Sequence, residues 1–266
     1  MKHITSRDNA QFKELKQLAT SSQARRRAGR TLLDGVHLCQ AYWQSAGAPQ
    51  ICVISDTSAR HTEVAALLEQ CEAAQVSCLC LPDAMYKALS QVENGIDVLF
   101  IIATPQPVLP HTFKTSTVVL DNLQDPGNLG SILRSAAAAG IQNIVCSSGT
   151  VFAWSPKVMR AGMGAHFLLN IYEDVELATL LKSVRMPILA TSSHAQHQIY
   201  QTNLQQEVVW LFGHEGQGVS DQLMALATTT VTIPQRAEIE SLNVAASAAI
   251  CFFEQVRQRL HGHGTR

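Results

Sequence analysis

Three short polar stretches in the second half of the chain hold most of the side chains that could do chemistry. They are "LDNLQDPGNLGSILR" (120–134), "FGHEGQGVS" (212–220) and "IPQRAEIESLN" (233–243). Together they supply amides, carboxylates, a hydroxyl and an arginine, which can bind a polar ligand and stabilise charge that develops during a reaction. Each stretch follows an apolar run typical of a strand. Three such junctions in one half of the chain suggest one shared site.

The glycines of the second stretch favour close contact between the backbone and a flat ligand. Gly213, Gly216 and Gly218 are spaced G-x-x-G-x-G, which is not the order of a dinucleotide-binding loop, and the chain contains no G-x-x-x-x-G-K-[ST] phosphate loop. Glycine lets main-chain N–H and C=O groups approach a ring such as adenine. Tight-turn geometry alone is the other explanation for these glycines.

A structural role explains part of the other two stretches. Ser241 or Asn243 could cap an alanine-rich helix, and Asn128 could form a turn or cap at the helix predicted from "DPGNLGSILR". Arg134 falls to one side of the apolar face of that helix, so it is not a core residue. Taken alone, it would be a solvated surface arginine.

The elements that must position these residues alternate between strands and helices. In the second half, apolar runs predict strands at 116–121, 143–147, 167–171, 187–191, 207–213 and 229–233. Helical segments separate them, and a long helix follows from about Asn243. Mostly continuous apolar runs indicate a largely parallel sheet covered by helices on both faces. Ligands bind such sheets beyond the carboxyl ends of the strands, where all three polar stretches fall.

The first half shows a separate α/β pattern. Strand-like runs at 51–55, 76–80 and 97–103 alternate with helical segments. Pro105, Pro107 and Pro110 then follow in close succession, which neither a helix nor a central strand accommodates well. We therefore expect a domain of residues 1–105, a linker at 106–115 and a second domain of residues 116–266.

The composition indicates a globular, cytoplasmic protein. With 266 residues and 46% hydrophobic content the chain can form a real core. Its longest apolar runs are too short to span a bilayer, and its first residues lack the apolar core of a signal peptide, so no membrane is expected. The seven cysteines, several within apolar runs, indicate free buried thiols. Close pairs such as Cys78 and Cys80 have no partner pair at zinc-finger spacing, so no metal is expected.

The charge is concentrated at one end of the chain. Residues 1–30 carry eight basic and two acidic side chains, whereas the whole chain has a net charge of −1. The run Arg25, Arg26 and Arg27 is the densest part of this segment. Such asymmetry suggests a contact with a polyanion. A solvated helix face followed by a basic loop is the alternative.

The combination of motifs resembles the SpoU, or TrmH-like, branch of the SPOUT RNA methyltransferases. The matching features are N-x-x-x-x-x-R at Asn128 and Arg134, G-x-E-G-x-G from Gly213 to Gly218, and I-P followed by E-S-L-N-V and a helix of small residues. Their order and spacing match as well. Residues 1–105, with "ITSRDNAQFKELKQL" and "RRRAGRTLLDGVHL", resemble the RNA-substrate-binding domain of that family, which has an L30e-like fold. The resemblance covers nearly the whole chain.

The resemblance implies a fold, a cofactor and a set of site residues. Residues 116–266 would form a SPOUT methyltransferase domain, an α/β fold with a mostly parallel sheet and a deep trefoil knot, which is an exception to the usual unknotted topology. The knot loops would bind S-adenosylmethionine, through Gly213, Gly218, Ile233 and Leu242. The catalytic residues would be Asn128, Arg134, Glu215, Ser241 and Asn243. The RNA-binding residues would include Arg25, Arg26 and Arg27. Relatives of this branch act as homodimers and methylate a ribose 2′-oxygen.

Three departures from the family pattern concern the cofactor loops. The family usually has Met and, two residues later, Gly where this chain has Gln235 and Ala237, and a smaller or amide residue at His214. If the family glycine needs a positive φ, Ala237 requires a rearranged loop, which bears on cofactor affinity.

The expected activity is methylation of a ribose 2′-hydroxyl in RNA with S-adenosylmethionine as cofactor, most of all in ribosomal RNA. Transfer RNA as the substrate, or a non-catalytic RNA-binding module, are the alternatives. A nicotinamide-dependent oxidoreductase lacks the required glycine fingerprint. Arg134 would act either as the base or as a cation that holds a phosphate and stabilises developing negative charge.

Overall fold

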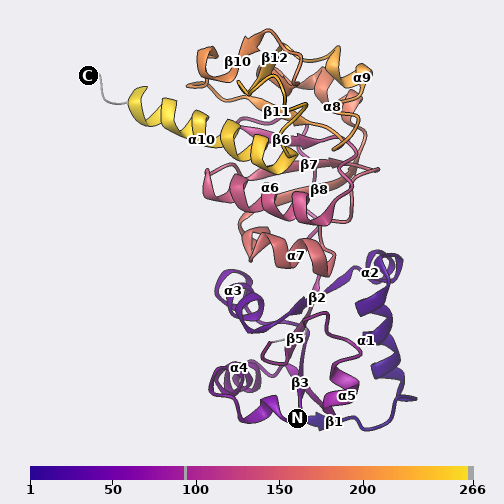
Figure 1. Ribbon diagram of the computed structural model, residues 1–266. Helices are drawn as coiled ribbons and strands as arrows, with labels where there is room; N and C mark the ends of the chain where they lie inside the picture. Colours follow the sequence, from indigo (N-terminus) through magenta and orange to yellow (C-terminus); the bar gives the residue numbers. More distant parts are fainter. Residues whose placement is uncertain (93–94, 263–266) are drawn as a thin grey trace. The chain divides into compact units, whose positions relative to one another are not determined.

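The computed structural model describes residues 1–92 and 95–262. The chain divides into two compact units, one formed by Met1–Pro105 with Trp154–Phe167 and the other by Gln106–Ala153 with Leu168–Arg266. Each unit has its own sheet and helices (Figure 1). Among the described residues, no helix is both long and apolar enough to cross a membrane. All seven cysteines are free and buried, as the sequence predicts.

The first unit contains a five-stranded mixed sheet in the order β1-β4-β3-β5-β2. Strands β1, β4 and β3 are parallel, and β5 is antiparallel to both β3 and β2. The strands are β1 (Lys2–His3), β2 (Arg30–Asp34), β3 (Ile51–Ser55), β4 (Ser77–Leu81) and β5 (Val98–Ala103). The short β1, and β2 with it, were not predicted as strands from the sequence.

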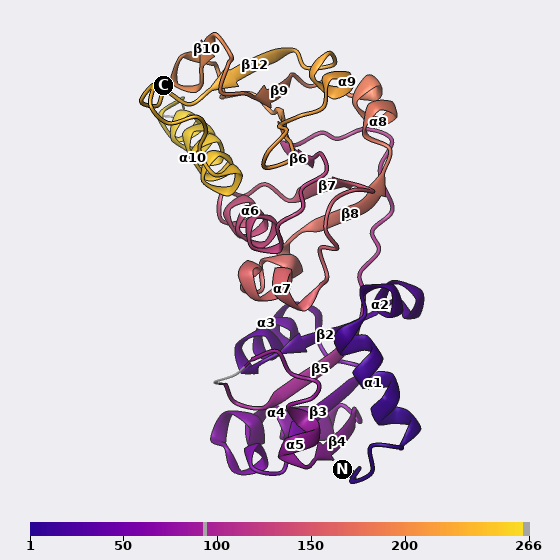
Figure 2. The same cartoon turned by 45° about the vertical axis from the view of Figure 1, so that its right-hand side comes forward.

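Helices cover both faces of this sheet. The two faces carry α1 and α5 on one side and α3 and α4 on the other (Figures 1 and 2). Asn9 caps α1 by accepting hydrogen bonds from the backbone N–H groups of Gln11 and Phe12, and the helix buries Phe12, Leu15 and Leu18 against the sheet. The helices are α1 (Ala10–Thr20), α2 (Ser22–Ala28), α3 (Val36–Ala46), α4 (Thr62–Ala73) and α5 (Asp83–Tyr86).

A segment distant in sequence completes the first unit. The helix α7 (Pro156–Gly162) packs next to β2. The hydroxyl of the buried Thr31 donates to the backbone O of Trp154 at 2.6 Å, and Arg160 donates to the backbone O of Gln91 at 2.6 Å. These contacts differ from the sequence-based assignment of all of residues 116–266 to one domain.

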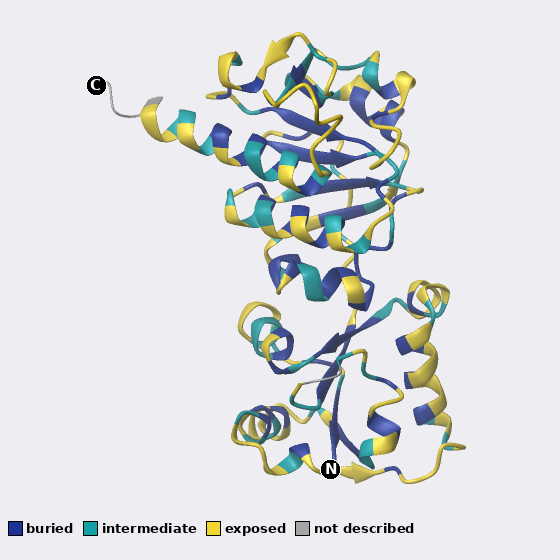
Figure 3. Cartoon of the chain, viewed as in Figure 1, coloured by how far each residue is buried: buried dark blue, intermediate teal, exposed yellow. Residues whose placement is uncertain are grey.

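The second unit contains a seven-stranded sheet in the order β10-β12-β9-β11-β6-β7-β8, and all its strand pairs are parallel. This confirms the predicted parallel α/β architecture. The strands are β6 (Thr117–Leu120), β7 (Asn143–Ser147), β8 (Asn170–Val175), β9 (Ile188–Thr191), β10 (His197–Gln198), β11 (Val209–Phe212) and β12 (Thr229–Thr232). Within each unit the strands are mostly buried, while the helices expose their outer faces (Figure 3).

Two local predictions for the second half need correction. The strand expected at 167–171 is shifted: Ala165–Leu168 form a 3₁₀ turn, and β8 begins only at Asn170. The apolar pair Phe167 and Leu168 misled the sequence interpretation, since Leu168 is 64% exposed. The predicted linker 106–115 also contributes to the core of the second unit, because Phe113 is buried and its ring packs 5.8 Å from that of Tyr172.

The helices of the second unit lie on both faces of its sheet. Figure 2 shows α6 and α10 together on one side and α8 and α9 on the other. The helices are α6 (Pro126–Ala138), α8 (Leu177–Ser183), α9 (Asp221–Met224) and α10 (Val244–Gly262). On α10, Phe252 is fully buried and its ring lies 5.7 Å from that of Phe212 on β11, so this helix is part of the core.

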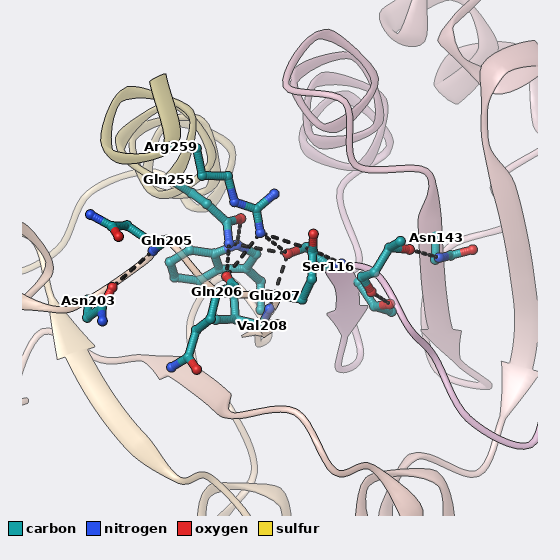
Figure 4. A network of polar contacts seen from close by, with 12 residues as sticks. Ser116, Asn143, Asn203, Gln205, Gln206, Glu207, Val208, Gln255 and Arg259 are labelled. Atoms are coloured by element: carbon teal, nitrogen blue, oxygen red, sulfur yellow. Dashed lines mark hydrogen bonds and ion pairs between the residues drawn. The ribbon is translucent and has the colours of Figure 1, made fainter. Parts of the chain in front are cut away.

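A polar network fastens the second half of α10 to the amino ends of β6 and β11 (Figure 4). Gln255 donates from Nε2 to the Ser116 hydroxyl at 3.2 Å and accepts from Trp210 Nε1 at 3.1 Å. Arg259 forms an ion pair with Glu207 at 3.0 Å. The buried polar groups of Gln255 and Trp210 are therefore paired. The network holds the second half of α10 at the amino ends of the strands.

Candidate active site

The first two polar stretches lie side by side at the carboxyl ends of the central strands. Strands β6 and β11 pair in parallel, with Leu120 opposite Phe212. Residues 121–128 continue from β6, and residues 213–220 continue from β11. The backbone N–H of Asp121 donates to the backbone O of Phe212 at 2.8 Å, which extends the pairing into the loops. The parallel sheet thus brings together two motifs that are far apart in the sequence.

Glu215 connects these two stretches. Its Oε1 accepts hydrogen bonds from the backbone N–H of Asp125 at 2.9 Å and from Asn128 Nδ2 at 3.2 Å, and its Oε2 accepts from the backbone N–H of Gln124 at 3.2 Å. Burial alone would raise the pKa of Glu215. The hydrogen bonds, that of Asp125 first, outweigh burial and hold the pKa below its usual value. The ionised carboxylate therefore holds the turn in front of α6.

Asn243 connects the third stretch to the first. Its Nδ2 donates to Asn128 Oδ1 at 2.9 Å, while its Oδ1 accepts from the backbone N–H groups of Ala245 at 2.9 Å and Ala246 at 3.2 Å. Asn243 is therefore both a helix cap and a cross-link between loops. Because a carboxylate only accepts, Asn128 turns its Nδ2 to Glu215 and its Oδ1 to Asn243. We call this chain Glu215–Asn128–Asn243 the relay.

Two predicted catalytic residues, Arg134 and Ser241, lie outside the relay. Arg134 is exposed on α6, as its position beside the apolar face predicts, and Ser241 is exposed in the loop before α10. Neither side chain forms a hydrogen bond or ion pair with any residue in the described part of the chain. The structure thus brings together Asn128, Glu215 and Asn243 and leaves the guanidinium and the hydroxyl accessible to solvent.

The glycines of the second stretch form a tight turn. The backbone N–H groups of His214 and Gly218 each donate to the carbonyl oxygen of the other, at 2.9 and 2.8 Å, and Gly218 has a φ of 72°. A Cβ atom on Gly213 would lie 2.1 Å from the backbone of Gly218. Turn geometry therefore requires Gly213 and Gly218 here. The unusual His214 fits the same turn, because its Nδ1 accepts from the backbone N–H groups of Gly216 at 3.0 Å and Gln217 at 3.2 Å.

The third stretch, residues 233–243, is an exposed loop between β12 and α10. Gln235 closes it locally, with Nε2 donating to the backbone O atoms of Ile239 at 3.0 Å and Glu240 at 3.2 Å. Ala237 is not among the described residues that adopt a positive φ. A glycine is therefore not needed at position 237 in this loop, and Gln235 and Ala237 are both compatible with its conformation.

The sequence interpretation missed the role of Asp121. Its Oδ2 accepts from the backbone N–H of Ser220 at 3.0 Å, which ties β6 to the end of the glycine turn. Asp121 also lines a cavity of about 230 Å³ at the carboxyl ends of β6, β7 and β8, together with Ser147, Asp174, Glu176 and Leu223. None of the residues predicted to bind the cofactor lines this cavity. An acidic residue directly after a central strand was the available signal.

The three arginines predicted to bind RNA, Arg25, Arg26 and Arg27, differ in their exposure to solvent. Arg26 and Arg27 are exposed on α2, but Arg25 is only 4% exposed. The Arg25 guanidinium donates to the backbone O of Leu18 at 2.5 Å and to the hydroxyl of Ser22 at 2.8 Å, and burial lowers its pKa. Arg25 therefore caps the carboxyl end of α1, which corrects the prediction that it binds RNA.

Comparison with known proteins identifies the family. The SpoU rRNA Methylase family matches residues 115–253, which include the whole relay and all three polar stretches. The chain belongs to this family.

Two relatives and one solved structure are similar to this chain over nearly its whole length. It is 32% identical to an uncharacterized tRNA/rRNA methyltransferase of Synechocystis sp., over 96% of this chain and 94% of that one. It is 27% identical to the 23S rRNA (guanosine(2553)-2′-O)-methyltransferase RlmP of Bacillus subtilis, over 95% and 98% of the two chains. The crystal structure of an RNA 2′-O ribose methyltransferase matches with a TM-score of 0.81 and 29% identity, over 97% of this chain and 99% of that one.

Proposed function

We propose that this SpoU-family protein transfers the methyl group of S-adenosylmethionine to a ribose 2′-hydroxyl of RNA. The proposed substrate is ribosomal RNA. The observation that carries the proposal is the relay, because Glu215, Asn128 and Asn243 bind the three motif loops to one another at one edge of the sheet. RlmP, whose name gives the same reaction on 23S rRNA, matches this chain over nearly its full length.

The loops around the relay fit an adenosine-containing cofactor. Leu242 is 36% exposed and Ile233 is half-buried. Apolar side-chain surface is therefore accessible to a ligand next to main-chain polar groups. An adenine ring has apolar faces and a polar edge, which this combination would bind. We infer that Ile233 and Leu242 contact the cofactor, and that Gly213 and Gly218 shape the turn beside it. The cofactor supplies an activated methyl group on a sulfonium.

Glu215 positions other groups and does not remove the proton from the ribose. Methyl transfer to an alcohol requires the methyl carbon and the 2′-oxygen in near-attack geometry, with loss of the hydroxyl proton. Both carboxylate oxygens of Glu215 already accept hydrogen bonds from the first stretch. Its function in this proposal is to fix Asn128 and, through it, Asn243.

Arg134 acts as a cation in the reaction. Its side chain is exposed, and a guanidinium is protonated under ordinary conditions, so it cannot serve as a base without a strong perturbation. It binds a phosphate next to the target ribose and stabilises negative charge that develops on the 2′-oxygen. The proton leaves to that phosphate or to water. We infer that the exposed Ser241 hydroxyl binds the same ribose.

Further features of the proposal rest on the resemblance to the family. The chain of the second unit would be tied in a deep trefoil knot, and the first unit would be an L30e-like RNA-binding domain. A mixed sheet with helices on both faces supports the second point. The active form would be a homodimer in the cytoplasm.

Arg134 provides the test of the proposed function. Arg134→Ala should lower single-turnover methylation by more than about a hundredfold, as for other groups that stabilise developing charge. S-adenosylmethionine affinity should stay unchanged. Arg134→Lys should also be slow, because an ammonium lacks the planar fork of the guanidinium. Arg185→Ala, which removes another exposed arginine of the second unit, is the matched control.

The assay requires the natural substrate, which is found by mapping methylated riboses in ribosomal and transfer RNA from cells with and without the protein. A site lost only from transfer RNA would replace the ribosomal substrate. No lost site and no binding of S-adenosylmethionine would overturn the proposed function. A rate of Arg134→Ala within about threefold of wild type, roughly 0.65 kcal/mol of barrier, would exclude Arg134 from the mechanism.

A further inference from the structure

Three side chains with metal-binding atoms meet at the carboxyl ends of three neighbouring strands of the first unit, β1, β4 and β3. His3 lies on β1, Cys80 on β4, and Asp56 directly follows β3. One ligand atom of each residue lies within 4.8 Å of the ligand atoms of the other two. The thiol of Cys80 donates a hydrogen bond to Asp56 Oδ1 at 3.0 Å. The site described above for methyl transfer uses none of these residues.

The backbone ladder fixes this arrangement. His3 is paired with Cys80 across β1 and β4, and Cys80 is paired with Ile54 across β4 and β3. Asp56 is two residues beyond Ile54, and its backbone N–H donates to the backbone O of Leu81 at 2.9 Å. Side chains two residues apart on a strand lie on the same face, so all three ligand atoms lie on one face of the sheet.

The donor set suits zinc. Sulfur, imidazole nitrogen and carboxylate oxygen are the ligands that Zn²⁺ binds in proteins, at about 2.0–2.3 Å, so ligand atoms around one tetrahedral ion are about 3.3–3.8 Å apart. The ligand atoms lie within 4.8 Å of one another, so no pair has to approach by more than about 1.5 Å, and the exposed side chains of His3 and Asp56 can make this shift. One thiolate and one carboxylate also balance the charge of the ion.

We propose that His3, Asp56 and Cys80 bind one Zn²⁺ ion, which fastens strand β1 to β4 and β3. On binding, the Cys80 thiol releases its proton to solvent and a zinc–thiolate bond forms, with neutral His3 and ionised Asp56 as the other protein ligands. Water can occupy the remaining position. Strand β1 has only the residues Lys2–His3 and pairs only with β4 in the described structure, so it gains most from such a cross-link.

In the metal-free state the Cys80 thiol donates its proton to Asp56 Oδ1, so the sulfur and the carboxylate already face one another. A zinc ion would have to replace that proton. The expectation from the sequence that no metal binds rested on spacing along the chain. His3, Asp56 and Cys80 form no linear motif, and only the parallel pairing of their strands brings them together.

A second cluster of possible metal ligands lies in the core of the first unit. The Sγ atoms of Cys52, Cys71 and Cys78 also lie within 4.8 Å of one another, and all three residues are buried. Thiolates also bind Zn²⁺ well. To reach these three sulfurs, however, an ion would have to enter the core, whereas the side chains of His3 and Asp56 are exposed. We therefore assign the zinc site to His3, Asp56 and Cys80.

Cobalt titration of the full chain, stripped of metal by chelation, tests the assignment. Co²⁺ should bind once per chain, with visible bands of a tetrahedral site and an ultraviolet thiolate-to-cobalt band, and Zn²⁺ should displace it. His3→Gln, Asp56→Asn and Cys80→Ser should each weaken binding by more than about tenfold, since even groups behind the ligands have effects of that size. Cys71→Ala and His61→Gln are the matched controls and should bind as wild type.

Hydrogen exchange gives a second readout that is local to β1. The backbone N–H of Ile4 donates to the backbone O of Cys80 at 3.1 Å. Zn²⁺ should slow exchange at Ile4 in the wild type but not in His3→Gln, a variant of an exposed residue that leaves the core intact even if Cys80→Ser fails to fold. A missing thiolate–cobalt band would overturn the proposal. So would a band that persists in His3→Gln and disappears in Cys71→Ala.

Discussion

At the scale of the residue, the hydrogen bonds of Glu215 decide what it does. Both carboxylate oxygens hold the first turn of α6 and the residues before it, which links the glycine turn to the start of that helix. A glutamine in its place would direct an NH₂ group at one or more N–H donors. Removing the charge should therefore loosen the relay without disturbing the core.

Glu215→Gln should weaken S-adenosylmethionine binding by about tenfold, which corresponds to the loss of one charge-assisted hydrogen bond. Because the folded-state pKa of Glu215 is lowered, the carboxylate stabilises the loops above its unfolded pKa, and this is lost as the pH falls through the lower, folded value. Calorimetric titration of the cofactor measures the affinity. Glu69→Gln, an exposed change in the first unit, should have no effect, and an unchanged Kd in Glu215→Gln would contradict the role of the relay.

Three of the five predicted catalytic residues, Asn128, Glu215 and Asn243, are in contact, while the roles of Arg134 and Ser241 stay predictions. All three residues in contact lie in segments that follow strands of one parallel sheet, namely β6, β11 and β12. The order of the strands therefore brings these segments to the same end of the sheet. The sequence could not show that Arg25 differs from Arg26 and Arg27, because a run of identical residues does not indicate which one is turned inward.

At the scale of the element, α2 presents its arginines selectively. The helix begins at the Ser21 cap and ends at Gly29, whose φ of 59° suits glycine. Arg25 is turned towards the last carbonyl groups of α1, so Arg26 and Arg27 remain on the outer surface of the first unit. Two arginines of this helix, not three, are exposed.

The double variant Arg26→Ala with Arg27→Ala should weaken RNA binding and lower its salt dependence. Each lost phosphate contact reduces the slope of log K against log salt by about 0.9. The pair Arg60→Ala with Lys87→Ala removes the same charge elsewhere in the first unit and should have a smaller effect. Arg25→Ala should instead lower the thermal stability. Filter binding at several salt concentrations measures the slope, and an unchanged slope would show that α2 is only a solvated surface.

At the scale of the whole molecule, α10 presents two different faces. Its inner face packs on β11 through Phe252 and is fastened by Gln255 and Arg259. Its outer face carries Phe253, which is 48% exposed, and Leu260, which is 71% exposed. Within one chain, therefore, this helix has one face in the core and a second apolar face that is exposed.

We expect the protein to be a dimer at micromolar concentration, with the outer face of α10 in the interface. Phe253→Glu should then give a monomer, because a carboxylate would be buried without a partner. Light scattering coupled to gel filtration measures the mass. Val108→Glu, at an apolar position that is 91% exposed outside the helices, should leave the dimer intact. A monomeric wild type would refute the expectation.

The chain returns to the first unit through the segment Trp154–Phe167, which contains α7. This return has a consequence for folding during synthesis. Thr31 is fully buried, and its hydroxyl has its partner in the backbone of Trp154, which leaves the ribosome only after β6, α6 and β7. Until then the nascent first unit lacks both this hydrogen-bond partner and the packing of α7 next to β2. A truncated chain that ends at Pro105 would lack them permanently. Synthesis of the second unit therefore begins before the first unit is able to finish folding.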